Sequence, residues 1–412
     1  MAGQASDLPT PPPERLGVPS RNPLPLSASQ ESQVRDIYYA RVRKQCAEEI
    51  KGVYSSGLLA NPNHDSNTIP SAAFAACALG RTFTVSFACR TEHRAMNGCM
   101  KLHATQAERT EELIIGNNYF VGGAVNPRDS DLKISNAGDG IVFNGFKFFN
   151  TGGVISDLTV LEGVYEDTTD HIFAIVKTDQ AGINFGHDWN NVGLRLTESG
   201  SVKIENVKAP WADALGWDAS AKKPDPAVLG IPFGTLLLPT IQLVFSNFYI
   251  GIAWGALNTA TAYTNASTRA WPFGGDNKEE PQEEFYILAT YGNFLAHLRA
   301  ATALAEKAGQ QIDAVYKDTQ SVKDRAKVTA EARGEVAEWV ASVKVVSTDV
   351  GLRVTSGVFE VTGAKATSTK VGLDRFWRDI RTHTLHDPVA YKNRELGRYQ
   401  LLREVPEPTW YT

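Results

Sequence analysis

The sequence predicts an α+β protein in which a β domain lies between two helical regions. Three observations support this class: residues 29–118 have a helix-like composition, residues 119–228 contain short alternating runs, and residues 229–412 return to helical periodicity. A chain of 412 residues is too long for one simple core, so roughly two to three domains are expected. Residues 1–28 are rich in Pro and Ser and lack an apolar stretch, and we interpret them as a loosely held tail rather than a signal peptide.

The first helical region is indicated by residues 36–53, which are rich in Ala, Glu, Lys and Arg, and by the Ala-rich residues 71–80. All cysteines of the chain lie here and form no CxxC pair. This predicts free thiols in a reducing compartment, and therefore a cytoplasmic location. The cysteines are Cys46, Cys77, Cys89 and Cys99.

The middle region alternates runs of β-branched and aromatic residues with turn signals such as residues 136–140. Several short strands at this spacing are typical of a β-barrel or a β-sandwich. The expected strands cover residues 131–135, 141–149, 158–161, 171–176 and 201–207.

The third region shows apolar residues at helical steps of three and four. The first set is Leu288, Tyr291, Leu295 and Leu298, and the second is Val336, Val340, Val343 and Val350. Residues 270–276, with a Pro and two Gly, should separate two helices, and residues 309–319 are expected to hold another loop.

Composition excludes two classes of partner. A net charge of −5 argues against a nucleic-acid platform, which usually carries a strong basic excess. The apolar residues 236–257 are long enough to cross a bilayer, but one proline and several polar residues interrupt them. We therefore expect no membrane span, and interpret this stretch as the central helix of a bundle, apolar on all sides.

Residues 375–392 have the most informative composition in the chain, combining basic side chains, two histidines and large aromatics. Pro388 should end the helix and leave His383, His386 and Asp387 at its terminus, where functional groups are common. The arginines recur at helical spacing and can present planar donors to a phosphate or carboxylate on one face. These are Arg375, Arg378 and Arg381.

This segment resembles the C-terminal signature of flavin-dependent monooxygenases built on the acyl-CoA dehydrogenase fold, the dibenzothiophene monooxygenase group in particular. That fold has the same order of regions. The resemblance implies an N-terminal helical domain, a middle β-barrel domain and a C-terminal four-helix bundle whose tail completes a flavin site. It places His386 near the reactive edge of the flavin and His383 in a supporting role.

Two runs in the middle domain resemble the parts of this family that lie along the flavin. In residues 144–153, two glycines let the backbone approach a flat ring, and Thr151 offers a hydroxyl beside Phe149. The alternative is a plain β-turn with the Thr hydroxyl bonded to its own backbone. In residues 188–201, Trp189 matches an aromatic wall beside the isoalloxazine, the alternative being a Trp of the β-domain core.

The resemblance implies further site residues. His93 takes the place of an active-site histidine, although a helical His is often structural. Arg269 matches an arginine that binds the cofactor phosphate from a neighbouring subunit, the alternative being a solvent-facing Arg. A Gly-bearing turn at residues 356–365 should also contact flavin across that interface. Its residues are Ser356, Gly357 and Gly363. The substrate pocket should be formed by Phe149, His93 and Gly123, which replaces a family asparagine.

The residues favour oxygenation over dehydrogenation. Acyl-CoA dehydrogenases need a carboxylate base, usually a Glu, and residues 384–389 contain only Asp387. An oxygenase needs a dry pocket and proton donors, which His386, His93 and Thr151 can supply. No GxGxxG follows an early strand, so a separate reductase should supply the reduced flavin. The two C-terminal histidines lack further ligands, so no metal is expected.

The sequence therefore predicts a two-component flavin-dependent monooxygenase. We expect FMN, with FAD as the alternative flavin, and O2 activation through a C4a-(hydro)peroxyflavin. The substrate should be a small or medium hydrophobic molecule oxygenated at S, N or C. Completion of the flavin site across subunits implies a homo-oligomer, a tetramer by family resemblance. The alternatives are an acyl-CoA dehydrogenase or oxidase, and a flavin-free binding protein, for which Gly123 is the only support.

Overall fold

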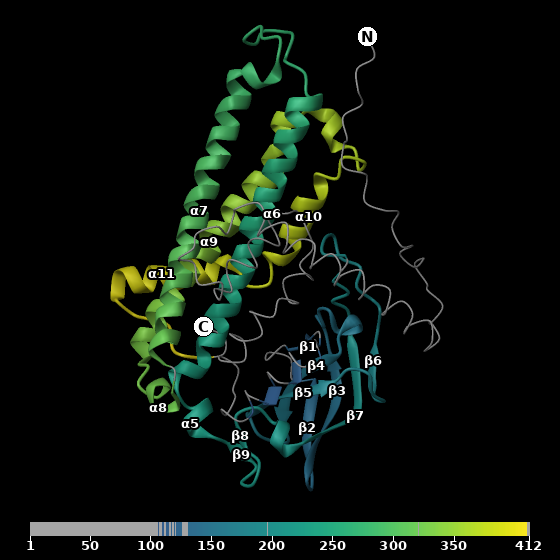
Figure 1. The fold of residues 1–412 in the computed structure, drawn as a ribbon, viewed down its shortest axis with the longest axis vertical. Coiled ribbons are helices and arrows are strands. Elements are labelled where there is room, and N and C mark those ends of the chain that lie inside the picture. Colours follow the sequence, from purple (N-terminus) through teal and green to yellow (C-terminus); the bar gives the residue numbers. More distant parts are fainter. Residues whose placement is uncertain are drawn as a thin grey trace.

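The computed structural model describes residues 131–195, 197–319 and 321–409, together with residues 121–125 and isolated positions between 106 and 119 (Figure 1). The predictions for residues 1–28 and for most of residues 29–118, His93 included, lie outside the described residues. The β domain and the C-terminal helices carry the other predicted site residues.

The β domain is a seven-stranded sheet in the order β1-β4-β2-β3-β7-β6, with β5 on the second edge of β4. The strands are β1 (Val121–Ala124), β2 (Leu132–Ala137), β3 (Gly140–Lys147), β4 (Leu158–Tyr165), β5 (His171–Lys177), β6 (Ile183–Phe185) and β7 (Val202–Pro210). The five predicted strands are confirmed. β1 and β6 were missed because each has only three or four residues, too few to establish an alternating pattern.

The sheet is bent around a core but is an open half-barrel, since β6 pairs only with β7 among the described residues. One edge of β4 pairs in parallel with β1 along its first half and with β2 along its second half. β4 is also buried on both faces, since all but its last residue are buried. A two-stranded ribbon, β8 (Trp217–Asp218) and β9 (Lys223–Pro224), leads toward the helices.

Three long helices run side by side, and the sheet lies toward one end of them (Figure 1). A fourth helical stretch is broken at Pro388 into two shorter helices, α10 and α11, which pack on α9. The helices are α5 (Pro226–Leu229), α6 (Leu237–Ser267), α7 (Phe285–Asp318), α8 (Val322–Arg325), α9 (Ala330–Thr362), α10 (Asp374–His383) and α11 (Val389–Leu402).

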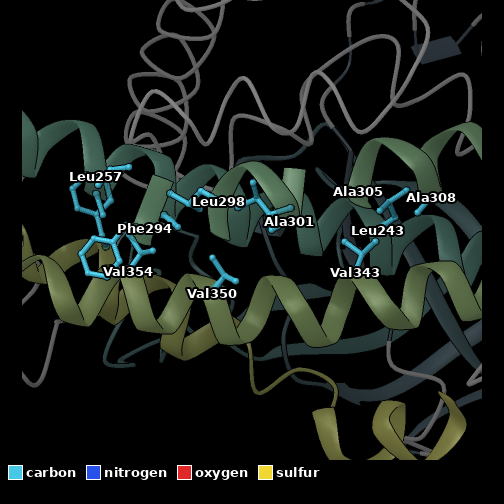
Figure 2. Close-up of a cluster of buried hydrophobic side chains, with 14 of the residues drawn as sticks. Leu243, Leu257, Phe294, Leu298, Ala301, Ala305, Ala308, Val343, Val350 and Val354 are labelled. Atoms are coloured by element: carbon cyan, nitrogen blue, oxygen red, sulfur yellow. The ribbon is translucent and has the colours of Figure 1, made fainter. Parts of the chain in front are cut away.

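Helix α6 is the central helix that its composition predicts. By length and hydropathy, the stretch Pro232–Ser267 could cross a membrane, but 67% of its most apolar window is buried inside the fold, as in the core helix of a soluble protein. α6 packs on α9 and α7 through small and branched side chains (Figure 2). The predicted valine face of α9 is confirmed, because Val336, Val340, Val343 and Val350 are all buried.

Two predictions for α7 were wrong. Of the predicted face, Leu298 is buried and Tyr291 packs on the core, but Leu288 is exposed. The buried face also includes Ile287, Phe294 and the alanines after Leu298. Figure 2 shows Phe294, Leu298 and these alanines. Residues 309–319 form no loop, because α7 continues to Asp318 and Gly309 is buried inside it. A glycine costs only about 1 kcal/mol inside a helix, and close packing in the core offsets that cost.

Candidate active site

The C-terminal segment ends its helix where Pro388 requires. α10 stops at His383, and Pro388 caps the start of α11, so His386 and Asp387 lie in the connection between them. The predicted basic face serves partly for structure: Arg378 donates through Nε to Asp374 at 3.0 Å and through a terminal nitrogen to the Val192 carbonyl at 3.1 Å.

The two histidines form a stacked pair. The rings of His383 and His386 lie 5.5 Å apart between centroids and 9° from parallel. Phe245 of α6 contacts both, with its ring centre 4.5 Å from His383 and 5.0 Å from His386. The side chain of His386 is 54% exposed, so its imidazole can meet a ligand directly.

Two polar contacts hold the Asp387 carboxylate beside the histidine pair. Its carboxylate accepts from Gln242 at 3.4 Å, and His386 Nδ1 lies 3.3 Å from its other oxygen. Burial alone would raise the pKa of Asp387, but the His386 hydrogen bond and the nearby charges of His386, Lys344 and Lys392 lower it to about 2. A carboxylate with so low a pKa is a weak base.

The turn after β3 presents the predicted Thr151 and Phe149. Thr151 begins a chain of hydroxyls: its Oγ1 lies 2.9 Å from Ser199 Oγ, which lies 2.6 Å from Thr197 Oγ1. Gly152 has φ 69°, a left-handed conformation that a side chain would strain. Phe149 is 62% exposed, so this turn leaves an aromatic face uncovered.

The loop that carries Trp189 is folded against this turn. Trp189 donates through Nε1 to the Leu194 carbonyl at 2.8 Å, and its ring meets that of Phe149 edge-on at 6.2 Å. The same indole packs on a small cluster that includes Phe245. Trp189 is half-buried, so it is neither a core residue of the β domain nor fully open to solvent.

Helix α10 holds that loop in place. The Leu194 amide donates to Asp379 Oδ1 at 2.7 Å, and the Gly193 amide donates to Thr382 Oγ1 at 2.9 Å. Gly193 is required for this approach, since a Cβ there would lie 2.0 Å from the Arg378 carbonyl oxygen. Burial raises the pKa of Asp379, although the Leu194 hydrogen bond and two arginines oppose that effect.

Aromatic contacts thus link three segments far apart in sequence: Phe149 of the Thr151 turn meets Trp189, Trp189 packs on the cluster that contains Phe245, and Phe245 contacts His386. Uncovered apolar side chains lie on these segments, as expected where a ligand binds. They are Phe148, Phe149, Val192, Trp377 and Leu385. A flat, partly polar group fits such residues, with aromatic faces for its ring and hydroxyl and imidazole groups for its edge. Among the described residues, no cluster of three His, Cys, Asp or Glu could hold a metal ion.

Comparison with known sequences decides the family. A dibenzothiophene monooxygenase of Mycolicibacterium goodii is 38% identical over 313 residues, which cover 74% of this chain and 73% of that protein. One from Rhodococcus erythropolis is 36% identical over 316 residues, 74% of this chain and 72% of its own. The chain belongs to the dibenzothiophene monooxygenase family. It is therefore a flavin-dependent monooxygenase.

Other comparisons agree with membership of this monooxygenase family. Residues 243–390 match the acyl-CoA dehydrogenase C-terminal domain. The structure of the methanesulfinate monooxygenase MsuC from Pseudomonas fluorescens superposes with a TM-score of 0.75 at 29% identity, covering 94% of this chain and all of the other. The structure of FMN-bound TdsC from Paenibacillus sp. A11-2 superposes with a TM-score of 0.72 at 29% identity, covering 93% of this chain and 98% of the other. A short match of residues 71–114 is to the cytochrome c oxidase biogenesis protein Cmc1-like family.

Four predicted site residues of this monooxygenase lie away from the histidine pair. Ser356 and Gly363 lie about 18 and 28 Å from Lys344 along α9, at 1.5 Å per residue. Arg269 is exposed just after α6, whose end contacts the end of α9 through the Thr268 bond to the Thr362 carbonyl. The expected turn at residues 356–365 was wrong for its first part, since Ser356 and Gly357 are helical, and the chain turns only at Gly363, which caps α9 with φ 80°.

Gly123 lies on β1, with the side chain of Val160 as a neighbour, and offers no polar group there. Three other residues at the site were missed: Tyr249, Lys344 and Asp379. A sequence signal existed for the first two. Each is a polar side chain on the buried face of a long helix, and such groups are retained only where they have a partner.

Proposed function

We propose that this chain is the oxygenase component of a two-component system, using FMN reduced by a separate flavin reductase and O2 to oxygenate a small organosulfur compound. The convergence of Thr151, Trp189 and His386 carries the proposal, because it joins the residues that the family resemblance assigned to one flavin. Among relatives, SfnC of Pseudomonas putida, described as a probable FMNH2-dependent monooxygenase, is 35% identical over 297 residues, 71% of each chain.

The cofactor and the side chains of the site would have separate roles. Reduced FMN would supply the activation of O2, which no side chain here can perform. Trp189 and Phe149 would cover the ring and exclude water, and the Thr151 hydroxyl would bond to its polar edge. His386, exposed at its tip and backed by the Asp387 carboxylate, would hold and deliver a proton. His93 remains a predicted partner in that role.

A sulfur substrate is supported by the relatives, whose names include dibenzothiophene and methanesulfinate. The uncovered phenylalanines of the turn at residues 148–149 suit an apolar thioether or thiophene better than an ion. Gly123 leaves more room and one polar contact fewer than an asparagine would.

A second copy of the chain would complete the flavin site. Arg269, Ser356 and Gly363 are exposed and lie near the far end of α9, where they would meet a flavin held by a neighbouring subunit. This supports a homo-oligomer, and we propose a tetramer in the cytoplasm. Native mass spectrometry measures the number of subunits in the assembly. Arg269→Ala should weaken FMN binding without changing that number.

An acyl-CoA dehydrogenase is disfavoured by Asp387, the carboxylate in residues 384–389 where that family carries its base. Its low pKa and its two hydrogen-bonded neighbours make it unsuited to removing an α-proton. Titration with acyl-CoA thioesters should therefore leave bound oxidised FMN unbleached.

The direct test supplies enzymatically reduced FMN, isotopically labelled O2 and a panel of thioethers, thiophenes, sulfinates, amines and phenols. We expect one labelled oxygen in a sulfur product. FMN binding with labelled amine or phenol products instead would overturn the substrate class. Failure to bind FMN would overturn the proposed function.

A further inference from the structure

Behind the histidine pair lies a buried polar group that the mechanism above does not use. Tyr249 of α6 and Lys344 of α9 are 0% and 1% exposed. Lys344 Nζ donates to the Tyr249 hydroxyl at 3.1 Å and to the Thr384 carbonyl at 3.4 Å. The Tyr249 hydroxyl in turn lies 2.9 Å from His383 Nδ1. Neither side chain has an exposed surface through which to reach a substrate.

The donors and acceptors fix the direction of these bonds. An ammonium group can only donate, so the Tyr249 oxygen accepts from Lys344 and directs its own proton toward His383. The His383 carbonyl, which accepts the His386 amide at 2.9 Å, has a second lone pair and lies 3.1 Å from the same hydroxyl, so it competes with Nδ1 for that proton, and the shorter distance of 2.9 Å favours Nδ1. The nearer Nδ1 is then the acceptor, and a neutral imidazole that accepts at Nδ1 carries its proton on Nε2.

We propose that Tyr249 and Lys344 are positioning residues for oxygenation, holding His383 as the neutral Nε2–H tautomer and thereby fixing the ring on which His386 stacks. This inference rests on the proposed function of His386 as the proton-handling group. A neutral, immobilised His383 leaves His386 free to carry a positive charge without an adjacent like charge.

The surrounding charges are consistent with this role. Burial lowers the pKa of His383 well below its usual value, and His386 and Lys344 act in the same direction while Asp387 opposes them. Burial lowers the pKa of Lys344 to about 8, with Asp387 opposing and Lys392 and Arg381 adding to the effect. These groups come from α9, α10, α11 and the connection after α10. At neutral pH, Lys344 stays mainly protonated and His383 neutral.

The first test needs no turnover. Nitrogen NMR of histidine-labelled protein, with His383 assigned by a His383→Gln variant, should show the Nε2–H tautomer in the wild type. Tyr249→Phe should shift His383 to a mixture of tautomers. An unchanged His383 spectrum in Tyr249→Phe overturns the proposal. Because this measurement uses the protein without substrate, it stands even if the proposed oxygenation fails.

The second test measures kinetics. Tyr249→Phe and Lys344→Met should lower the kcat of oxygenation about tenfold to a hundredfold and shift its pH profile, with the Kd for FMN and the KM held within about twofold. Lys344→Arg should retain most of the wild-type kcat, because an arginine can still donate a hydrogen bond to the Tyr249 hydroxyl. The control Tyr399→Phe loses an exposed hydroxyl that donates to Glu335 at 2.7 Å, and should behave as wild type.

A double variant separates positioning from misfolding. Tyr249→Phe alone leaves the Lys344 ammonium buried without its hydroxyl, which destabilises the fold. Tyr249→Phe with Lys344→Met removes both partners, so its unfolding temperature should recover while its kcat stays low. Recovery of kcat together with stability would show that the pair has only a structural role.

Discussion

The Leu194 amide donates a hydrogen bond of 2.7 Å to the Asp379 carboxylate, joining the Trp189 loop of the β domain to helix α10. Asp379→Ala should remove the acceptor and leave that amide unsatisfied, which costs about 1–3 kcal/mol of unfolding free energy. Asp379→Asn keeps an acceptor oxygen and should cost less. Urea unfolding of the three proteins checks this, and equal losses in both variants would contradict it.

Gly193→Ala should be more damaging than its size suggests. The added Cβ would sit 2.0 Å from the Arg378 carbonyl oxygen, so the loop must move away from α10. We expect a loss of about 1–3 kcal/mol in unfolding free energy together with weaker FMN binding. The control is Gly292→Ala on α7, where a Cβ meets nothing within 4 Å and should stabilise the helix by about 0.5–1 kcal/mol. Thermal unfolding and fluorescence titration with FMN measure both effects.

Thr151→Val should weaken FMN binding. It preserves the shape of the side chain but removes the hydroxyl that continues the Ser199–Thr197 chain. Loss of one hydrogen bond costs about 1 kcal/mol, or roughly fivefold in Kd. Thr168→Val, which loses a hydroxyl in an exposed turn between β4 and β5, is the matched control. An unchanged Kd for Thr151→Val would place the hydroxyl away from the flavin.

His386→Ala should suppress oxygen transfer more than flavin binding. Removal of a positioned proton donor costs about a hundredfold to ten-thousandfold in rate. The Kd for FMN should change little, because aromatic contacts supply most of the binding. The control is His297→Ala, which removes a histidine on α7 whose Nδ1 lies 2.8 Å from the Asn293 carbonyl of its own helix. The product yield of a single turnover measures oxygen transfer separately from FMN binding. Wild-type turnover in His386→Ala would exclude His386 as the proton donor.

Glu338 should make the fold less stable as the pH rises. Its side chain is buried in α9, neither carboxylate oxygen has a hydrogen-bond partner among the described residues, and burial with Glu395 nearby raises its pKa to about 7. The folded state binds more protons than the unfolded state above about pH 4.5, so stability falls between there and about pH 7. Glu338→Gln should lose this dependence and be more stable at pH 8. Glu360 is exposed on the same helix, so Glu360→Gln should leave the pH dependence of stability unchanged.

The sequence was most informative where a pattern was long or a residue type unusual. The five longer strands, the all-round apolar α6 and the break at Pro388 followed from periodicity and proline chemistry. The start of the α7 face was misassigned because Leu288 fits the spacing yet is exposed, although Leu298 of the same set is buried beside small alanines. Local patterns describe one element at a time and hold no information about which neighbour covers it.

The candidate site shows the same division. Thr151, Trp189 and His386 could be predicted as site residues because each stands in a motif. Tyr249, Lys344 and Asp379 matter through partners up to 185 residues away, and no local motif reports such pairs. Arg269 and Gly363 stay predictions, since their role depends on a second subunit.

The division of the site between the sheet and the helices has a thermodynamic consequence. The β domain alone would carry the Thr151 turn and the Trp189 loop, but neither C-terminal histidine and no α10 to brace the loop. A molecule bound between them is therefore linked to the folding of both parts. Saturating ligand should merge their melting into one cooperative transition. The cofactor would then stabilise the two parts of the fold together, in addition to taking part in the reaction.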